Sequence, residues 1–486
     1  MKNKFNLVFD KWLPVAEEGP LSLADVFSGR NCNNLYGNAA EVISLTKFLL
    51  AIVQSAYTPE DDKDWEIFGI EGMKKKAFKY LEDKKDLFWL YGENPFLQFP
   101  ELQEQKEKLK PGITCGTLTP HVATGNSTVL YDSQRERKFS DADKILLLLT
   151  LGFTFGGKTV VDKNSVDKSK GETSTAKSGP FLGLLHSYIL GGTLQETIYL
   201  NILTKENFKK SIPQDIGIAP WENMPRDNKA ESSCQTSYLG RLVPLSRFIL
   251  FDESSNDVLC REGIKYPGVK DGILDTDMCS RFNKKNEPSA IWIMNNKKPW
   301  RELTALLSFV SNSGNQTECK QLKICVGRAK EYKMNFGIMS GGLKVSSNAG
   351  EYYASKKDSF TASEVSFNNV ILGESWFNRF NTELKAIEYV AGVVYGSVKR
   401  FYISQKAEGN DIADTALTMF WQLCDGECQN LINACNCDEA AVVSMRKTYS
   451  VFAKNIYDNY CPHDTSRQLE TWAECRPNLY KYLTEV

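Results

Sequence analysis

Residues 374–405 read ESWFNRFNTELKAIEYVAGVVYGSVKRFYISQ. Apolar side chains recur along this stretch at intervals of four, three, four and three residues, which places them on one face of an α-helix. These residues are Phe380, Leu384, Ile387, Ala391 and Val394. Such a face predicts a helix that packs lengthwise against other helices in a bundle.

Three more segments with helical patterning follow the first one. They cover residues 411–433, 438–459 and 463–484. Short breaks at Gly409-Asn410, Asn436-Cys437 and Pro462 separate the four segments. Four helices with short connections predict an up-and-down bundle, so we expect a C-terminal four-helix bundle domain over residues 371–486.

The chain before residue 371 has a different character. FNLVFDKWLPV, residues 5–15, alternates apolar and polar residues and predicts a strand that Pro14 ends. Residues 39–57 have apolar side chains at helical spacing and predict a buried helix. Short elements alternate with long polar loops, of which 116–139 and 158–179 exceed the usual length of a connection. We therefore expect the α+β class, with a large mixed α/β domain over residues 1–370.

Composition narrows the class of protein further. The 486 residues include 59 Lys and Arg against 60 Asp and Glu, a net charge of −1, which argues against indiscriminate binding of nucleic acid by the isolated chain. The longest uncharged stretch, Ile145 to Gly157, is too short to span a bilayer, and no secretory signal is recognisable. Thirteen cysteines without a repeating framework suit a reducing compartment. We expect a soluble, cytoplasmic protein.

Residues 152–159, GFTFGGKT, match the phosphate-binding loop pattern G-x-x-x-x-G-K-[ST]. That loop functions between a strand and a helix whose N-terminus binds phosphate. Here Ser140 and Asp143 indicate the start of a helix upstream, and a polar, lysine-bearing loop follows. A nucleotide-binding protein using Gly152–Thr159, with a helix beginning at Lys158, is therefore an alternative that we do not favour.

Residues suited to catalysis or metal binding are scarce. The only histidines are His121, His186 and His463, and the sequence places none of them in a paired-His or His–Asp arrangement. We expect no enzymatic activity and no cofactor. Four cysteines are spaced C-x3-C-x6-C-x-C and admit a zinc site. They are Cys424, Cys428, Cys435 and Cys437. The first two lie four residues apart on the second predicted bundle helix, where small apolar cysteines commonly just pack, and we favour packing.

Three turns that contain lysine or glycine are a further candidate site. They contain FGGK (155–158), NNKKPW (295–300) and SGGLKVSSNA (340–349). Each alone is most simply a solvated loop. If the three converge, small glycine-rich or lysine-tipped turns fit into a nucleic-acid groove where bulkier chains do not.

At these turns the chain resembles the CasA family, the large subunit of the type I-E CRISPR Cascade surveillance complex. The matching pieces occur in the family's order over most of the length and end in a helical bundle. They are NLVFDKWLPV (6–15), LSLADVF (21–27), ENPFLQ (93–98), ATGNSTVLYD (123–132), FGGK, GGTLQETIYLNIL (191–203), SYLGRLVPLSRFIL (237–250), KKPWRELTALL (297–307) and SGGLKVSSNA.

The resemblance implies a DNA-binding, non-nuclease subunit of an RNA-guided antiviral defence complex. Members of the family test double-stranded DNA for a protospacer-adjacent motif from the minor groove and wedge the duplex open, so that R-loop formation begins. They also help to recruit a helicase-nuclease. Implied partners are the motif-bearing DNA, the 5′ end of the guide RNA, the Cascade backbone and small subunits, and the helicase-nuclease.

The resemblance also implies which residues carry each role. The glycine loop maps to Phe155, Gly156, Gly157 and Lys158, and the lysine finger to Lys297 or Lys298. The wedge maps to Ser347, Asn348 and Ala349, and the loop toward the guide or neighbouring subunits to Thr124, Gly125 and Asn126. Asn348 departs from the glutamine familiar in the family. A scaffold whose loops do not touch DNA is the remaining alternative.

Overall fold

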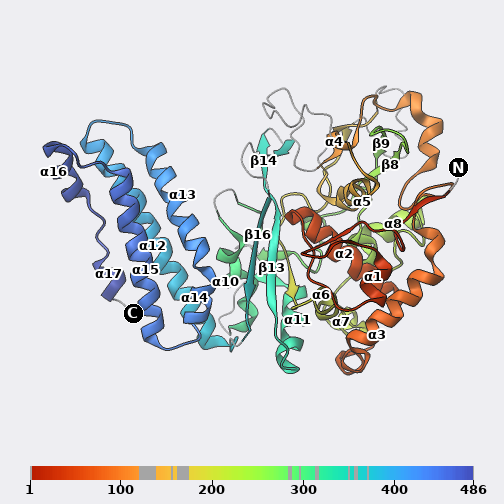
Figure 1. Cartoon of the computed structure of the whole chain (residues 1–486), viewed down its shortest axis with the longest axis horizontal. Helices are drawn as coiled ribbons and strands as arrows, with labels where there is room; N and C mark the ends of the chain where they lie inside the picture. The colour runs from red at the N-terminus through yellow and green to blue at the C-terminus, as the bar shows by residue number, and fades with distance from the viewer. Residues whose placement is uncertain are drawn as a thin grey trace. The chain divides into compact units, whose positions relative to one another are not determined.

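The computed structural model consists of two compact units (Figure 1). Unit 1 comprises Met1–Asn295 and Gln316–Glu364, and unit 2 comprises Asn296–Asn315 and Val365–Val486. The residues that the structure describes are 3–119, 138–154, 157–160, 175–282, 287–294, 297–311, 317–348, 351–354, 360–368 and 371–484.

Unit 1 mixes helices with short strands. Its α-helices are α1 (Leu23–Ser28), α2 (Ala39–Ala56), α3 (Asp62–Asp83), α4 (Cys115–Leu118), α5 (Asp141–Leu149), α6 (Leu194–Asn201), α7 (Lys205–Lys210), α8 (Asn228–Thr236), α9 (Tyr238–Leu242) and α11 (Lys320–Glu331). Its 3-10 helices are η1 (Lys85–Leu87), η2 (Pro100–Lys108), η4 (Thr150–Phe153) and η7 (Val269–Asp271).

The strands of unit 1 form several small sheets. They are β1 (Lys4–Asn6), β2 (Leu13–Val15), β3 (Gly19–Leu21), β4 (Trp89–Tyr91), β5 (Gly157–Lys158), β6 (Thr175–Ala176), β7 (His186–Leu190), β8 (Arg247–Phe251), β9 (Val258–Glu262), β10 (Cys279–Phe282), β11 (Pro288–Ala290), β12 (Thr317–Cys319), β13 (Gly337–Leu343), β14 (Val345–Asn348) and β15 (Glu351–Ala354). Strand β16 (Phe360–Ser366) leads into unit 2. The α+β class expected from the sequence is confirmed.

Helix α2 lies at the centre of the core of unit 1. Its N-cap Asn38 and Glu41 form a capping box, which satisfies backbone N–H groups at the helix start. Packing partners of α2 include β13, α3, α5, α6 and α9. Among the described helices, α2 is the one long and apolar enough to cross a membrane, but 78% of that stretch is buried inside the protein. The buried helix predicted at 39–57 is confirmed.

The central sheet of unit 1 has the strand order β16-β13-β7. Strands β13 and β7 pair antiparallel, with Ile338 opposite Ile189 and Ser340 opposite Ser187. Because β13 is buried along most of its length, the strand is the fixed base from which β14 continues. This sheet therefore supports the hairpin β14–β15 at its exit from the core.

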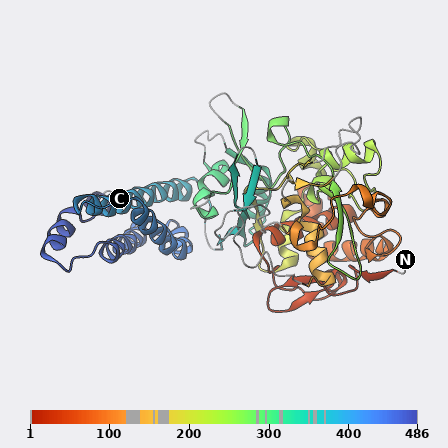
Figure 2. The same cartoon turned by 90° about the horizontal axis from the view of Figure 1, so that it is seen from above.

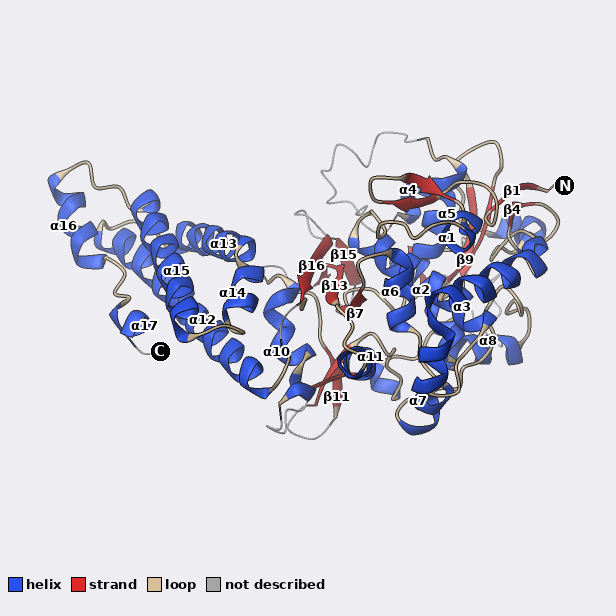
Figure 3. Ribbon diagram, turned by 60° about the horizontal axis from the view of Figure 1, so that its bottom comes forward, coloured by secondary structure: helices blue, strands red, loops and turns tan. Residues whose placement is uncertain are grey.

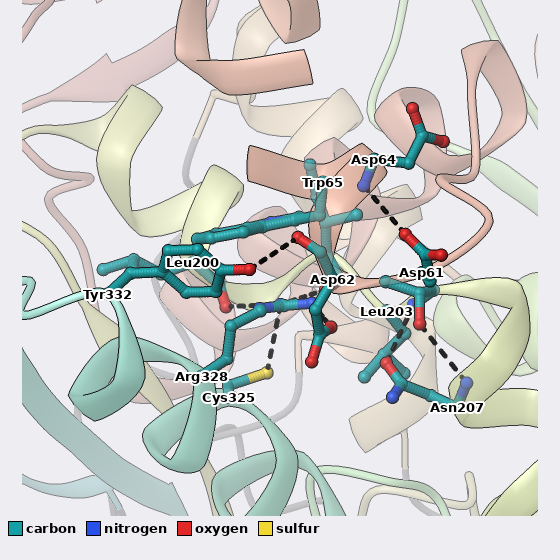
Figure 4. Close-up of polar contacts among 12 residues, drawn as sticks. Asp61, Asp62, Asp64, Trp65, Leu200, Leu203, Asn207, Cys325, Arg328 and Tyr332 are labelled. Atoms are coloured by element: carbon teal, nitrogen blue, oxygen red, sulfur yellow. Dashed lines mark hydrogen bonds and ion pairs between the residues drawn. The ribbon is translucent and has the colours of Figure 1, made fainter. Parts of the chain in front are cut away.

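A buried arginine joins three helices of unit 1 (Figure 4). The guanidinium of Arg328 in α11 lies 4.2 Å from the ring centre of Trp65 in α3 and forms an ion pair with Asp62. It also donates to the carbonyl oxygens of Leu200 and Ile202, at the end of α6. A buried charge is tolerated only when it is paired and hydrogen-bonded, so these contacts hold α3, α6 and α11 together.

Unit 2 is helical in its described part from residue 371 onward (Figures 2 and 3). Before residue 371 unit 2 contains η8 (Pro299–Glu302), α10 (Leu303–Leu306) and η9 (Ser308–Val310). The helices that follow are α12 (Glu374–Ser404), α13 (Asn410–Gly426), α14 (Cys428–Ala434), α15 (Glu439–Tyr460), α16 (Ser466–Cys475) and α17 (Tyr480–Thr484). Helices α12, α13 and α15 pack on one another, and α16 packs on α12. All five residues of the apolar stripe read from residues 374–405 are buried in this bundle.

Two of the four helical segments predicted for the bundle are interrupted. Glu427 separates α13 from α14, so the segment predicted at 411–433 is two helices. Residues 476–479 separate α16 from α17, because Pro477 lacks the N–H that a continuous helix requires. The predicted segments at 374–405 and 438–459 each correspond to one helix.

The single strand predicted over residues 5–15 is wrong. Strand β1 ends at Asn6, and β2 begins at Leu13 and contains Pro14. Between them the side chain of Asn6 accepts a hydrogen bond from Val8 N, and the Asp10 carboxylate accepts one from Asn6 N. Asn and Asp side chains that bond to nearby backbone groups favour a turn over an extended strand.

Candidate nucleic-acid interface

Lys297 and Lys298, which we call the lysine turn, lie at the start of a short 3-10 helix, η8 (Pro299–Glu302), in unit 2. Pro299 occupies the first turn, where a missing N–H costs nothing and the fixed φ suits a helix. Lys297 Nζ lies 2.7 Å from Glu302 Oε1 in an ion pair. Lys298 is the N-cap residue and makes no ion pair with the residues that the structure describes. The two lysines therefore differ in their surroundings.

The lysine turn is anchored to the bundle helix α13. Trp300 is buried, and its Nε1 donates a hydrogen bond of 2.7 Å to Asp425 Oδ1. The Arg301 guanidinium carbon lies 3.3 Å from the ring centre of Trp421, one helical turn before Asp425. Burial raises the pKa of the Asp425 carboxyl, against the opposing effect of the Trp300 hydrogen bond. These contacts fix the turn to the bundle, with partners that the sequence did not identify.

A sequence signal for these partners does exist. Asp425 follows the run Phe420, Trp421 and Cys424, all three of them buried. An acidic side chain on the apolar face of a helix requires a polar partner. That signal indicates a buried hydrogen bond without saying which residue provides the donor.

The segments on either side of the glycine loop, residues 152–154 and 179–181, pack tightly against each other in unit 1 and form the base of the loop. Phe181 N donates to the carbonyl of Gly152, and Gly179 N donates to that of Thr154. A Cβ atom on Gly152 would lie 2.4 Å from the Phe181 ring, so the first glycine of the motif is required by close packing. Above this base, β5 pairs with β6 and places Lys158 opposite Thr175.

The structure contradicts the phosphate-loop alternative. Helix α5 precedes the motif and η4 includes its first two residues, and Ser140 and Asp143 make the capping box expected from the sequence. Gly157–Lys158 is a strand, and Val160 continues in a β-bridge with Leu109. A phosphate cradle needs a strand before the loop and a helix N-terminus after it, and at residues 157–160 the chain is extended instead.

The expected wedge lies on the hairpin β14–β15 of unit 1. Ser347 is opposite Tyr352, and Asn348 is opposite Glu351, which places both residues in the last two pairs before the turn. The hairpin continues from β13 through Lys344. Ser347 and Asn348 thus belong to a two-stranded sheet that is separate from the central sheet and follows directly after β13.

Several expected site residues lie outside the described ranges. They are Thr124, Gly125, Asn126, Phe155, Gly156 and Ala349. Of the remaining ones, Gly157, Lys158, Ser347 and Asn348 belong to unit 1, whereas Lys297 and Lys298 belong to unit 2. Convergence of the three turns stays a prediction.

The four cysteines singled out as a possible zinc set have different environments. Cys424 and Cys435 are buried, Cys428 is half-buried, and Cys437 is exposed. Burial raises the pKa of the Cys424 and Cys435 thiols, which disfavours the thiolate form that binds zinc. Among the described residues, no group of three or more His, Cys, Asp or Glu side chains is arranged to hold a metal ion.

The structure does contain a His–Asp pair, so the expectation that no histidine has such a partner is wrong. His186 Nδ1 lies 2.8 Å from Asp277 Oδ2, and His186 Nε2 lies 3.3 Å from the carbonyl oxygen of Phe181. His186 is completely buried, and both its ring nitrogens are occupied. Its place inside the apolar stretch FLGLLHSYIL was a signal for a buried histidine, but the partner lies 91 residues away.

The same pair belongs to a larger buried charge cluster, which we define as Lys47, His186, Arg241, Asp275 and Asp277. Lys47 Nζ lies 2.8 Å from Asp277 Oδ1, and Arg241 Nε donates to Asp275 Oδ1. Burial by itself would raise the pKa of the Asp277 carboxyl, but Lys47 and His186 outweigh it and the pKa is lowered. Each carboxylate of the buried charge cluster thus has a basic side chain within ion-pair distance, so the cluster is a structural element.

Taken together, the fold and the turns define an α+β protein with a C-terminal helical bundle, of the kind found in CRISPR-associated Cse1 proteins. The model of the family "CRISPR-associated protein Cse1" matches residues 6–456. The chain belongs to this family, which confirms the resemblance to CasA.

Solved structures of the family have the same fold over the whole chain. Thermus thermophilus CasA (Cse1) matches with a TM-score of 0.75 at 16% identity, covering 100% of both chains. Thermobifida fusca Cse1 matches with a TM-score of 0.75 at 17% identity, covering 99% of this chain and 98% of that one. A chain of a CRISPR RNA-guided surveillance complex matches with a TM-score of 0.73 at 15% identity, covering 98% and 99%. No curated protein matches the sequence.

Proposed function

We propose that this chain is the large subunit of a type I-E CRISPR Cascade complex in the cytoplasm. In that complex it reads the protospacer-adjacent motif of double-stranded DNA from the minor groove and wedges the duplex open. It performs no catalysis itself. Its partners are the DNA, the 5′ end of the guide RNA, the Cascade backbone and small subunits, and the helicase-nuclease that it helps to recruit.

One observation carries this proposal: the Cse1 family model covers residues 6–456, and the fold agrees over the full length with that of a chain from an RNA-guided surveillance complex. A match confined to the bundle would support a general scaffold equally well. A match that also includes all three turns favours the reading of DNA.

Lys298 is the better candidate for the inserted lysine. Lys297 would have to give up its ion pair with Glu302 before it contacts a phosphate or a base edge, whereas Lys298 has no such ion pair within the described residues. The anchor of Trp300 and Arg301 on α13 keeps the turn in place, so little conformational entropy is lost when the lysine binds. Minor-groove edges distinguish A·T from G·C but distinguish the two orientations of each base pair poorly, so we expect a degenerate motif.

The hairpin β14–β15 supports the wedge role. Separating a base step costs a few kcal/mol, and a wedge transmits force only if its base is rigid. The strand order β16-β13-β7 provides that base, because β14 follows directly from the buried strand β13. Asn348 is shorter than the glutamine familiar in the family, so we expect a shallower insertion.

The roles of the glycine loop, of residues 124–126 and of the bundle are proposed from the resemblance to the family. For the glycine loop, the extended backbone at its base is a second support. Gly156 and Gly157 permit a close approach of the backbone to the groove without a helix dipole. We assign Thr124, Gly125 and Asn126 to contacts with the guide or neighbouring subunits. The bundle is assigned to the small subunits and the displaced strand.

The experiment that tests the proposal replaces both lysines of the turn. Lys297→Ala with Lys298→Ala in the assembled complex should weaken binding of a motif-bearing duplex, because a cationic contact to DNA is lost. The matched control is Lys209→Ala with Lys210→Ala on α7. It removes the same charge from an adjacent pair in which one lysine also pairs with a glutamate, Glu206. Binding is measured at one fixed salt concentration.

We expect the turn variant to lose affinity for the motif-bearing duplex by tenfold or more, about 1.4 kcal/mol, while the control keeps it. Equal binding by both variants would contradict the DNA-reading role and favour a scaffold. An equal loss in both would mean that only total charge matters.

A further inference from the structure

A small cavity adjoins the buried charge cluster in unit 1. Its lining includes Lys47, Arg241 and Asp275 of the cluster, together with Gln214 and Tyr238. About 10 Å³ of the cavity is open to the centre of a water molecule. That volume holds one water molecule and nothing larger.

Three polar atoms of the residues that line this cavity have no hydrogen-bond partner among the residues that the structure describes. They are Gln214 Oε1, Tyr238 Oη and Asp275 Oδ2. All three residues are more than nine-tenths buried. A buried polar atom without a partner is costly, and three around one cavity point to a common partner.

The distance between two side chains of the buried charge cluster also indicates that a molecule occupies this cavity. Lys47 Nζ and Asp275 Oδ2 are 3.9 Å apart, too far for a direct hydrogen bond, although the pair is buried. Polar groups at such a separation are commonly bridged by water. Asp275 Oδ1 is already engaged by Arg241, so Oδ2 is the oxygen of this carboxylate that is left for a further partner.

The donors and acceptors match a single neutral molecule. The Tyr238 hydroxyl donates, whereas Gln214 Oε1 and Asp275 Oδ2 accept. A cation is disfavoured because the ammonium of Lys47 and the guanidinium of Arg241 lie beside the cavity, and an anion is disfavoured by the Asp275 carboxylate. We propose that the cavity binds one structural water molecule, which accepts hydrogen bonds from Tyr238 and Lys47 and donates to Gln214 and Asp275.

This water completes a connection between separate parts of unit 1. Lys47 is on α2, Tyr238 and Arg241 are on α9, and Asp275 and Asp277 precede β10. The water thus joins the acidic segment before β10 to α9 and to the segment that contains Gln214. It is an integral part of the core, held by four side chains.

A high-resolution crystal structure of the full chain tests the site directly. We expect one density peak within hydrogen-bonding distance of Gln214 Oε1, Tyr238 Oη and Asp275 Oδ2. An empty cavity, or direct bonds among the three side chains, would overturn the proposal. An anomalous signal at the peak after exchange into rubidium would show a cation and would also overturn it.

A pair of tyrosine variants tests the same site in solution. Tyr449 also has a buried hydroxyl that finds no partner within the described part of the chain, but it does not line this cavity. Tyr238→Phe should raise the unfolding equilibrium constant roughly fivefold, because one hydrogen bond of the water is lost. Tyr449→Phe should leave that constant unchanged or lower it. If the two variants behave alike in urea unfolding, the water site is refuted.

Discussion

Lys297 and Lys298 are adjacent in sequence, yet only Lys297 has a carboxylate, Glu302, within ion-pair distance among the described residues. At this scale the local environment distinguishes two lysines between which the sequence did not decide. The ion pair with Glu302 holds Lys297 near η8. Lys298, as N-cap residue, precedes the anchored Trp300 by two positions.

This difference leads to a prediction for the single variants. Lys298→Ala in the assembled complex should weaken binding of the motif-bearing duplex by about 1 kcal/mol or more, and Lys297→Ala should weaken it less. The measurement is a titration of the duplex at fixed salt, with the scrambled duplex alongside. A larger loss for Lys297→Ala would contradict the assignment.

Asp277 provides a prediction for pH. Lys47 and His186 lower the pKa of this carboxyl below its ordinary value, so below about pH 5 the unfolded chain binds a proton that the folded chain does not. The free energy of unfolding contributed by Asp277 is therefore present above the ordinary pKa and is lost as the pH falls. The limiting slope for one carboxyl is about 1.4 kcal/mol per pH unit.

Urea unfolding between pH 6 and pH 3 measures that slope, with pH limits chosen to bracket the ordinary aspartate pKa of about 3.9. Asp277→Asn should be less stable at pH 6 and less sensitive to acid than the unaltered chain. Asp464→Asn, at an exposed position, is the control and should keep the original slope. Identical slopes for all three proteins would show that Asp277 is not the titrating group.

Single residues were also where prediction from sequence failed most clearly. His186 and Asp277 are 91 residues apart, and Lys47 and Asp277 are 230 apart. No local pattern encodes such a pairing, because it depends on how α2, β7 and the segment before β10 pack. The wedge and glycine-loop residues were identified only through resemblance to a family.

At the scale of elements, helices were predicted better than strands. Helices α2, α5 and α12 combine a regular apolar spacing with, for α2 and α5, a capping box, and both signals are local. Most strands of unit 1 have only two to five residues, which is too short for alternation to be recognised. The paired positions of β14 and β15 depend on a turn and were not predicted.

The strand β5 leads to a prediction about nucleotides. Because Gly157–Lys158 is a strand and not a helix N-terminus, ATP with magnesium at millimolar concentration should leave the melting temperature of the chain unchanged. Thermal unfolding with and without the nucleotide checks this. A concentration-dependent rise in the melting temperature would restore the nucleotide-binding alternative.

At the scale of the whole molecule, the division into two units separates the proposed DNA-contacting groups. The hairpin β14–β15 and the base of the glycine loop belong to unit 1, and the lysine turn belongs to unit 2 with the bundle. The net charge of −1 fits a subunit that provides a few placed contacts. Under the proposed function, guide pairing and the other subunits would supply most of the affinity, as in other RNA-guided systems.

The most direct test of motif reading compares the Cascade complex reconstituted with and without this chain. Motif-bearing and motif-scrambled duplexes are titrated against both assemblies at one stated salt concentration, because affinity for DNA depends steeply on salt. We predict that only the assembly containing the chain prefers the motif-bearing duplex. An equal preference in the assembly that lacks the chain would contradict the proposed function.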